Sequence, residues 1–263
     1  MITMKQLSKL LTLILFSFIF SNLSAQEDKF KNDPVATKED DRTFRLGLQF
    51  SPNLSWLSPS TSGFEGEGTR FNFNYGLSTE FFLTKNYLFS TGLFVSSLGG
   101  EVSYEGLYKD GSGNYFPSKV KQSYNIQYLE IPVVLKLRTN QLGYMTYYGA
   151  FGLRTAFKLN SNSDYEYAAG YPKLENENTS SDVFFMNMWL VIGGGIEYNL
   201  SGNTNISVGV TYNNGFINVL NSKPNELDAN GNATLGTDGK PVYKDKDASA
   251  NINYFALEIG LYF

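Results

Sequence analysis

Eight charged residues lie within stretches of sequence that otherwise alternate between apolar and small polar side chains. Four are basic and four are acidic: Arg45, Lys136, Arg138 and Arg154, and Glu80, Glu130, Glu197 and Glu258. Two carboxylates brought together, such as Glu197 and Glu258, are the groups that acid–base hydrolysis uses. The equal number of both signs instead favours a salt-bridge network, because a buried charge is costly unless it is paired. We therefore expect no catalytic residue among them.

The composition excludes several other kinds of site. The 263-residue chain contains no His and no Cys, which excludes Ser–His–Asp and Cys–His catalysis, disulfides, and metals bound by His or Cys. Its formal net charge is −4, whereas nucleic-acid-binding proteins carry a basic surface. We expect a protein that is not an enzyme, needs no cofactor or metal, and binds no nucleic acid.

The start of the chain predicts an exported protein. Residues 1–25 combine a basic start, a short apolar run and small residues near Ala25, which is typical of a cleaved secretory signal peptide. The apolar run is too short for a helix that spans a bilayer, which needs about 20 residues. Residues 26–43 are charged and aperiodic, so we expect a flexible leader there, followed by one domain at residues 44–263.

From Phe44 onward the apolar residues recur with a period of two, which predicts β-strands. Eight such runs are found, at residues 44–51, 71–81, 87–96, 129–138, 145–154, 186–197, 206–213 and 255–263. Short turns are expected at 84–86, 139–143 and 201–204, and long polar loops at 52–70, 99–123, 160–182 and 220–250. Short and long connections thus alternate, as in outer-membrane barrels.

The expected fold is all-β: an eight-stranded antiparallel up-and-down transmembrane β-barrel of the outer membrane, with both termini periplasmic. Alternation alone also fits a soluble barrel, which would turn its bulky face inward. The polar face favours the membrane barrel, because small residues and balanced charges suit a narrow lumen. The opposite face is apolar and carries no charge in its central part, as lipid requires.

The positions of the charges along the strands predict how the lumen is filled. Most lie near the short turns, and only Glu130 and Arg154 lie nearer the middle. We expect a salt-bridged floor, with Arg45 and Glu258 pairing between the first and last strands. Above it we expect a wetter cup, lined by Asn72, Asn74, Tyr124, Tyr128, Lys158 and Asn187.

Three smaller motifs have structural interpretations. Pro132 lies within a strand and lacks a backbone donor, so a local bulge, or a ladder carbonyl satisfied in another way, is expected there. The glycines at 193–195 indicate a barrel kink rather than a phosphate-binding loop. Residues 228–232 resemble the start of a calcium-binding loop, but their spacing does not match that of an EF-hand, so a flexible acidic loop is expected.

Several segments resemble a known family. The strand at residues 128–136, YLEIPVVLK, is similar to a strand of the outer-membrane β-barrel domain of Bacteroidetes, called the PorT-like or "porin family" group. The segments at 148–152, 192–198, 212–218 and 257–263 fall where that family has similar sequences. The aromatic last residue, Phe263, resembles the signal that barrel-assembly machinery recognises. The resemblance implies a Gram-negative outer membrane as the location and, for the family's namesake, an accessory role in protein secretion and gliding.

Three functions follow as hypotheses. The first is a non-enzymatic scaffold that presents four long extracellular loops, has outer-membrane lipid as its surroundings, and has a lumen plugged by the balanced salt-bridge network. The loop residues Tyr104, Tyr108, Tyr115, Tyr165, Tyr167 and Tyr171 would suit an adhesive surface on it. The second is a small passive pore for ions or solutes. The third is a PorT-like accessory of a secretion apparatus, in contact with its subunits.

Overall fold

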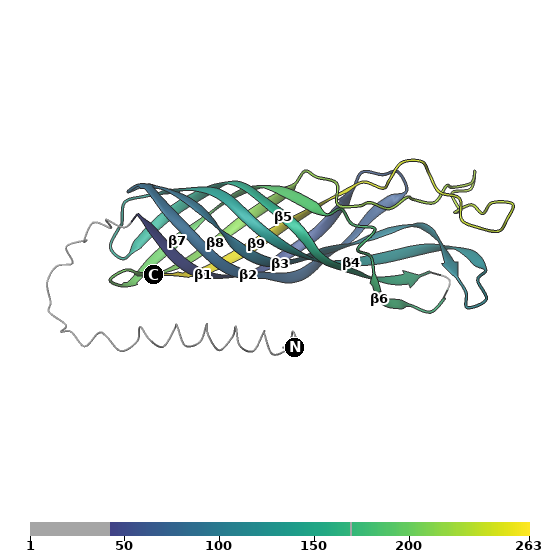
Figure 1. Ribbon diagram of the computed structural model, residues 1–263, viewed down its shortest axis with the longest axis horizontal. Helices are drawn as coiled ribbons and strands as arrows, with labels where there is room; N and C mark the ends of the chain where they lie inside the picture. The colour runs from purple at the N-terminus through teal and green to yellow at the C-terminus, as the bar shows by residue number, and fades with distance from the viewer. Residues whose placement is uncertain (1–42, 169) are drawn as a thin grey trace, which may run out of the picture. The chain divides into compact units, whose positions relative to one another are not determined.

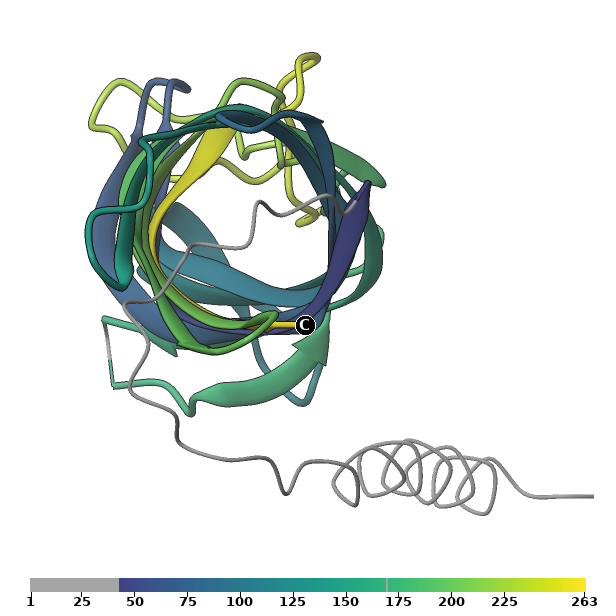
Figure 2. The same cartoon turned by 90° about the vertical axis from the view of Figure 1, so that its left-hand side faces the viewer.

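The computed structural model describes residues 43–168 and 170–263, and these form nine β-strands. Their bounds are β1 Phe44–Pro59, β2 Phe64–Thr84, β3 Tyr87–Lys109, β4 Tyr115–Arg138, β5 Met145–Tyr167, β6 Leu174–Asn178, β7 Met186–Ser201, β8 Thr204–Gly215 and β9 Ala250–Tyr262. Every strand pairs antiparallel with its neighbours. The order is β4-β3-β2-β1-β9-β8-β7-β5, and β4 pairs with β5 to close a ring of eight strands (Figures 1 and 2). The predicted up-and-down barrel is confirmed.

The two ends of the ring differ, as the loop lengths predicted. Short connections at residues 85–86, 139–144 and 202–203 share one end with the C-terminus, and we call it the turn end (Figure 1). The other end, the loop end, carries the longer hairpins and the connection between β8 and β9. The predicted signal peptide, and the leader up to residue 42, lie outside the described residues. Within the described part of the chain, no helix is long and apolar enough to cross a membrane.

Three of the four expected long loops are mostly strand. β1 continues to Pro59 and β2 already begins at Phe64. β3 and β4 are joined by residues 110–114, and β5 continues to Tyr167. Beyond the lipid both faces of a strand can be polar, so the contrast between faces that marks the lower strands fades there. The short β6 pairs with β5 outside the ring and was not predicted. The expected loop at 220–250 does lack a named strand before β9, among the described residues.

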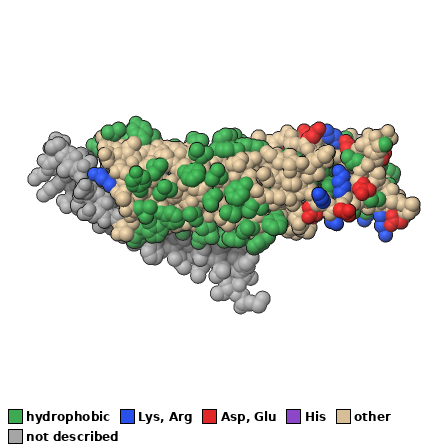
Figure 3. All heavy atoms as spheres, turned by 90° about the horizontal axis from the view of Figure 1, so that it is seen from above, with side chains coloured by type: hydrophobic (Ala, Val, Ile, Leu, Met, Phe, Trp, Pro, Cys, Tyr) green, Lys and Arg blue, Asp and Glu red, His purple; other side chains and the backbone are tan. Residues whose placement is uncertain are grey.

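The apolar face points outward and the charged face points inward, as predicted. Along β1, the exposed Phe44, Leu46 and Phe50 alternate with Arg45, which is only 1% exposed. On the face that Figure 3 displays, the outward apolar side chains cover the barrel and are remote from the charged side chains at the loop end. In this register Arg45 lies directly opposite Glu80 of β2.

Inward aromatic side chains near the turn end lie over glycines of other strands of the ring. The Tyr148 hydroxyl lies over Gly195 and Gly209, and the Tyr262 ring lies over Gly47. A Cβ at any of these glycines would overlap the aromatic group, so the close approach requires glycine.

The bulge expected at Pro132 is not present. Pro132 pairs with Arg154 of β5, and the pairing between β3 and β4 keeps its register across the proline, from Thr91 opposite Val133 to Phe94 opposite Glu130. The proline therefore interrupts the ladder without adding a residue. The bulge of β5 lies at Leu159, where Gln127 pairs with Asn160 and the next residue of β4 pairs with Lys158.

Candidate functional site

The lumen near the turn end is filled by a cluster of five charged side chains, which we call the lower cluster: Arg45, Glu80, Lys136, Arg138 and Glu197. Arg45 donates from Nε to Glu80 at 2.7 Å and from Nη2 to Glu197 at 2.5 Å. Lys136 pairs with the other oxygen of Glu80, and Arg138 lies 3.3 Å from Glu197. Three strands, β1, β2 and β4, are thereby tied to β7 across the bore.

The lower cluster is also enclosed by aromatic rings. The Arg45 guanidinium carbon lies 4.6 Å from the centroid of the Tyr262 ring. The Lys136 ammonium lies 4.6 Å from the Tyr148 centroid and 5.3 Å from that of Tyr262. Such contacts stabilise a cation that has left water. Glu80 is fully buried, so these ions are shielded from solvent.

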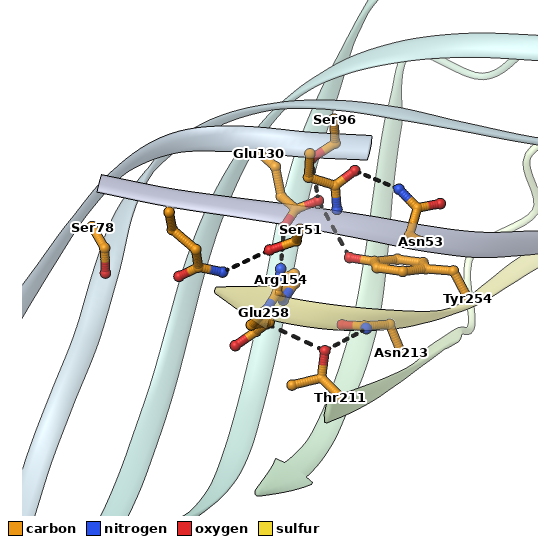
Figure 4. Close-up of polar contacts among 12 residues, drawn as sticks. Ser51, Asn53, Ser78, Ser96, Glu130, Arg154, Thr211, Asn213, Tyr254 and Glu258 are labelled. Atoms are coloured by element: carbon orange, nitrogen blue, oxygen red, sulfur yellow. Dashed lines mark hydrogen bonds and ion pairs between the residues drawn. The ribbon is translucent and has the colours of Figure 1, made fainter. Parts of the chain in front are cut away.

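A second cluster, the upper cluster, lies nearer the middle of the barrel (Figure 4). Arg154 of β5 donates to Glu130 of β4 at 2.8 Å and pairs with Glu258 of β9. Hydroxyl groups add hydrogen bonds to both carboxylates: Ser96 and Tyr254 donate to the second oxygen of Glu130 at 2.9 and 3.3 Å, and Thr211 donates at 3.2 Å to the Glu258 oxygen that Arg154 also binds. The two carboxylates share one arginine across the lumen.

The expected pairing of Arg45 with Glu258 was wrong. Gly47 lies opposite Tyr262 and Phe50 opposite Ile259, so Glu258 lies far along β1 from Arg45. Each residue adds about 3.3 Å along a strand, so the several residues between the positions of Arg45 and Glu258 separate these two side chains along the barrel wall. Glu258 therefore belongs with the middle charges rather than with those near the short turns. The stagger between the first and last strands, which spacing along the sequence does not reveal, explains the error.

The wet cup expected above the charges was also wrong, because this part of the lumen is an apolar core. Trp189 is fully buried, with Tyr128 and Tyr254 packed edge-on against it at 5.7 and 5.8 Å between centroids. Its Nε1 donates to the Ile252 carbonyl at 2.8 Å. Of the six expected cup residues, Asn74, Tyr124, Tyr128 and Asn187 are buried, and Asn72 and Lys158 are partly buried. The inward residues Leu57, Leu98, Val102, Ile126 and Ile252 complete this core.

The sequence did contain a signal for the core. Trp189 lies on the same face of its strand as the inward Asn187 and Glu197, so the period-two pattern already placed it in the lumen. The residues that cover it from the loop end had no such signal. Val183, Val219, Leu220 and Ala248 come from connections without regular pairing, and their place in the core depends on how those connections fold back.

The Asn218 side chain holds that covering segment in place. Its amide nitrogen donates to the carbonyls of Leu220 and Ala248, at 2.9 and 3.0 Å. Its amide oxygen accepts from the backbone N–H groups of Leu220 and Ala250, at 3.1 and 2.9 Å. One side chain thus joins the two ends of the long β8–β9 connection over the mouth of the barrel.

A small cavity lies between the charge clusters, lined by residues that include Lys136, Pro132, Arg154 and Glu258. The volume open to the centre of a water molecule is about 20 Å³, which is enough for about one water. The lumen therefore offers no chamber for an organic ligand here. In the described ranges, no group of three or more acidic, His or Cys residues is placed to hold a metal ion.

The loop-end parts of β3, β4 and β5, together with β6, form a sheet that we call the protruding sheet. The loop tyrosines form a stacked cluster on the side of this sheet that continues the lumen wall. The rings of Tyr108 and Tyr171 stack at 4.2 Å, and Tyr167 meets Tyr108 edge-on at 5.1 Å. Tyr104 donates to the Gln122 side chain, which donates in turn to Tyr165. Burial raises the pKa of the Tyr104 and Tyr165 phenols above the ordinary value. Because the rings stack on one another, they leave less aromatic surface for a partner.

Tyr115 lies apart from this cluster, beside the Lys109 ammonium at 5.6 Å from its ring centroid. The acidic loop at 228–232 is a tight turn in which the Asp228 carboxylate accepts from the backbone N–H groups of Asn230 and Asn232. These hydrogen bonds, chiefly those from Asn232, lower the pKa of Asp228.

Comparison with known proteins gives the family. A family model described as "Outer membrane protein beta-barrel domain" matches residues 24–221. No curated protein matches the sequence. Among solved structures, neisserial surface protein A is 12% identical with a TM-score of 0.39, over 82% of this chain and 95% of that one. Ail of Yersinia pestis is 11% identical with a TM-score of 0.33, over 84% and 100%. OprG of Pseudomonas aeruginosa is 11% identical with a TM-score of 0.34, over 84% and 94%. The chain belongs to the outer-membrane protein β-barrel domain family, and its family implies a location in the outer membrane.

Proposed function

We propose that this protein is a non-enzymatic outer-membrane scaffold with a closed lumen, which presents its loop-end sheet and β8–β9 connection as an interaction surface. One observation carries the proposal: the bore is filled in successive layers by the lower cluster, the upper cluster and the core around Trp189. A hydrated ion would have to displace buried ion pairs and then an aromatic core. This favours the scaffold over a small passive pore.

Recordings in planar bilayers test the closed lumen. The intact protein, refolded from the full mature chain, should give no steady current above that of the bare bilayer. A variant that thins all three layers, Arg45→Ala with Arg154→Ala and Trp189→Ala, serves as the control that shows the assay can detect an opened bore. Large, steady currents from the intact protein would contradict the proposal and favour the pore.

The orientation is part of the same proposal. The turn end, with both termini, faces the periplasm and the loop end faces the cell exterior. Because the chain has no Cys, single cysteines can report the two ends without background labelling. A membrane-impermeant maleimide on intact cells should label Ser112→Cys, in the β3–β4 turn, and should leave Asn140→Cys at the turn end unlabelled until the outer membrane is broken. The reverse pattern would show the opposite orientation.

The partners implied by the family resemblance are separate proposals. Phe263 directly follows β9 and is 55% exposed, which leaves its ring accessible to barrel-assembly machinery. Phe263→Ser should lower the amount of assembled barrel in cells and leave refolding of the purified chain unchanged.

Contact with secretion subunits would be seen as their co-purification with the intact protein, and a deletion strain would then show a secretion defect. Normal secretion in that strain would remove the accessory role.

A further inference from the structure

The outward surface of the barrel changes its chemistry just beyond the apolar band at the loop end. On β3, β4 and β5 the last apolar row consists of Val95, Leu129 and Phe157. The two rows above it consist of Ser97, Gln127 and Asn160, and of Gly99, Asn125 and Asn162. We call Ser97, Asn125, Gln127, Asn160 and Asn162 the amide patch. Figure 3 shows such a change on the face it displays, where uncharged polar surface separates the apolar band from the charged tip.

Most amide groups of this patch are available for a ligand. Asn125, Gln127 and Asn160 are exposed. Among the described residues, the side chains of Asn125 and Gln127 have no hydrogen-bond partner, and Asn160 uses only its oxygen, which accepts from the backbone N–H of Ser161. Asn162 donates to Asn176 of β6 at 2.9 Å. The outward amides of β8 and β9 differ, because Asn214 and Asn253 bind each other.

One cation, Arg70 of β2, lies at the edge of the patch over Gly99, and the two nearby lysines are engaged in other contacts. Lys121, in the charged rows above, lies 2.8 Å from Glu101. Lys158, beside the bulge at the lower edge of the patch, is bound to the carbonyls of Ser180 and Val183. A surface that binds phosphate uses Arg or Lys side chains. The patch instead offers neutral donors and acceptors, which match the hydroxyl groups of a sugar.

The height of the patch identifies which sugar can reach it. Two rows of a strand tilted by about 40° span about 10 Å along the barrel axis. They begin where the lipid-facing band ends, so they lie beside the headgroup layer. We infer that the amide patch binds the saccharide part of a lipopolysaccharide-type glycolipid of the outer leaflet. This rests on the proposed orientation, in which the loop end faces outward, and adds a lateral lipid contact to the scaffold.

Binding of two glycolipids to the full-length mature barrel in mixed micelles tests the inference. One probe is lipopolysaccharide with its core sugars, and the other is lipid A, which keeps the phosphates and acyl chains but lacks the core. Asn125→Ala with Gln127→Ala removes two unpartnered amides and should weaken binding of the core-containing glycolipid by about 10-fold, since each hydrogen bond contributes modestly. Lipid A binding should not change.

The matched control is Asn230→Ala with Asn232→Ala, which removes two exposed amides from the β8–β9 connection and should change neither affinity. Circular dichroism and the heat-dependent gel shift of each variant verify that the barrel is folded. Equal losses for both glycolipids, or no loss for either, would overturn the inference. Micelles have no inner or outer side, so this result is independent of the maleimide test, which alone decides the orientation.

Discussion

Removing one charge from the lower cluster should destabilise the barrel because it strands a buried cation. In Glu80→Gln the carboxylate that serves both Arg45 and Lys136 becomes a neutral amide of the same shape. Arg45 keeps Glu197 at 2.5 Å, but Lys136 loses its ion-pair partner and keeps a neutral amide oxygen and the two aromatic rings. Breaking a buried pair in this way costs about 3–5 kcal/mol, and the rings should keep the loss in the free energy of unfolding near the lower value, about 3 kcal/mol.

A double-mutant cycle with Lys136→Met separates the stranded charge from lost packing. The double variant removes both members of the pair and fills the lysine position with an apolar chain of similar length. We expect it to be about 2 kcal/mol more stable than Glu80→Gln alone, within the range of coupling between residues in contact.

The assay is urea unfolding in phospholipid vesicles, followed by the fluorescence of Trp56 and Trp189. Glu65→Gln is the matched control, because Glu65 is in an exposed ion pair with Lys119 at 3.5 Å. An exposed pair contributes about 0–1 kcal/mol, so this control should be nearly neutral. A loss below about 1 kcal/mol for Glu80→Gln, or additive effects in the cycle, would refute the stranded-cation reasoning.

Three further outcomes are expected. Trp189→Ala should lower the free energy of unfolding by about 3–5 kcal/mol, measured by urea unfolding, because it leaves a cavity in the apolar core; a loss under about 1 kcal/mol would mean that the core is not packed as described. Gly209→Ala should destabilise the barrel by overlap with the Tyr148 hydroxyl, and Tyr148→Phe in the same chain should recover part of the loss in the same assay; no recovery would exclude that overlap as the cause. Hydrogen bonds, first from the backbone N–H of Asn114, lower the pKa of Asp110, so they stabilise the β3–β4 turn above the ordinary Asp pKa and are lost as pH falls through the lowered value. The amide NMR signal of Asn114 should therefore be constant from neutral pH to about pH 4 and shift only below it, and Asp110→Ala should abolish the shift; a shift that begins well above pH 4 would contradict the sign.

The sequence was sufficient for the barrel and for the direction of its faces, because both follow from local periodicity. The number of strands in the ring, the positions of the short turns and the inward face of Arg45 all follow from a pattern that a few neighbouring residues define. Partners across the lumen depend instead on strand stagger, which sets the height of Glu258 relative to Arg45. The same limit hid the apolar core, because Leu220 enters it through an irregular connection.

β6 forms one edge of the protruding sheet, and its residues oppose growth of the sheet at that edge. β6 is five residues long, all exposed, and includes Glu175 and Glu177. Between them Asn176 adopts a left-handed backbone with φ of 57°, which bends the strand away from the extended form that a new partner would need. Short, charged and bent edges discourage strand addition. Neighbouring barrels in a crowded membrane can therefore meet at their β6 edges without joining their sheets into a continuous intermolecular sheet.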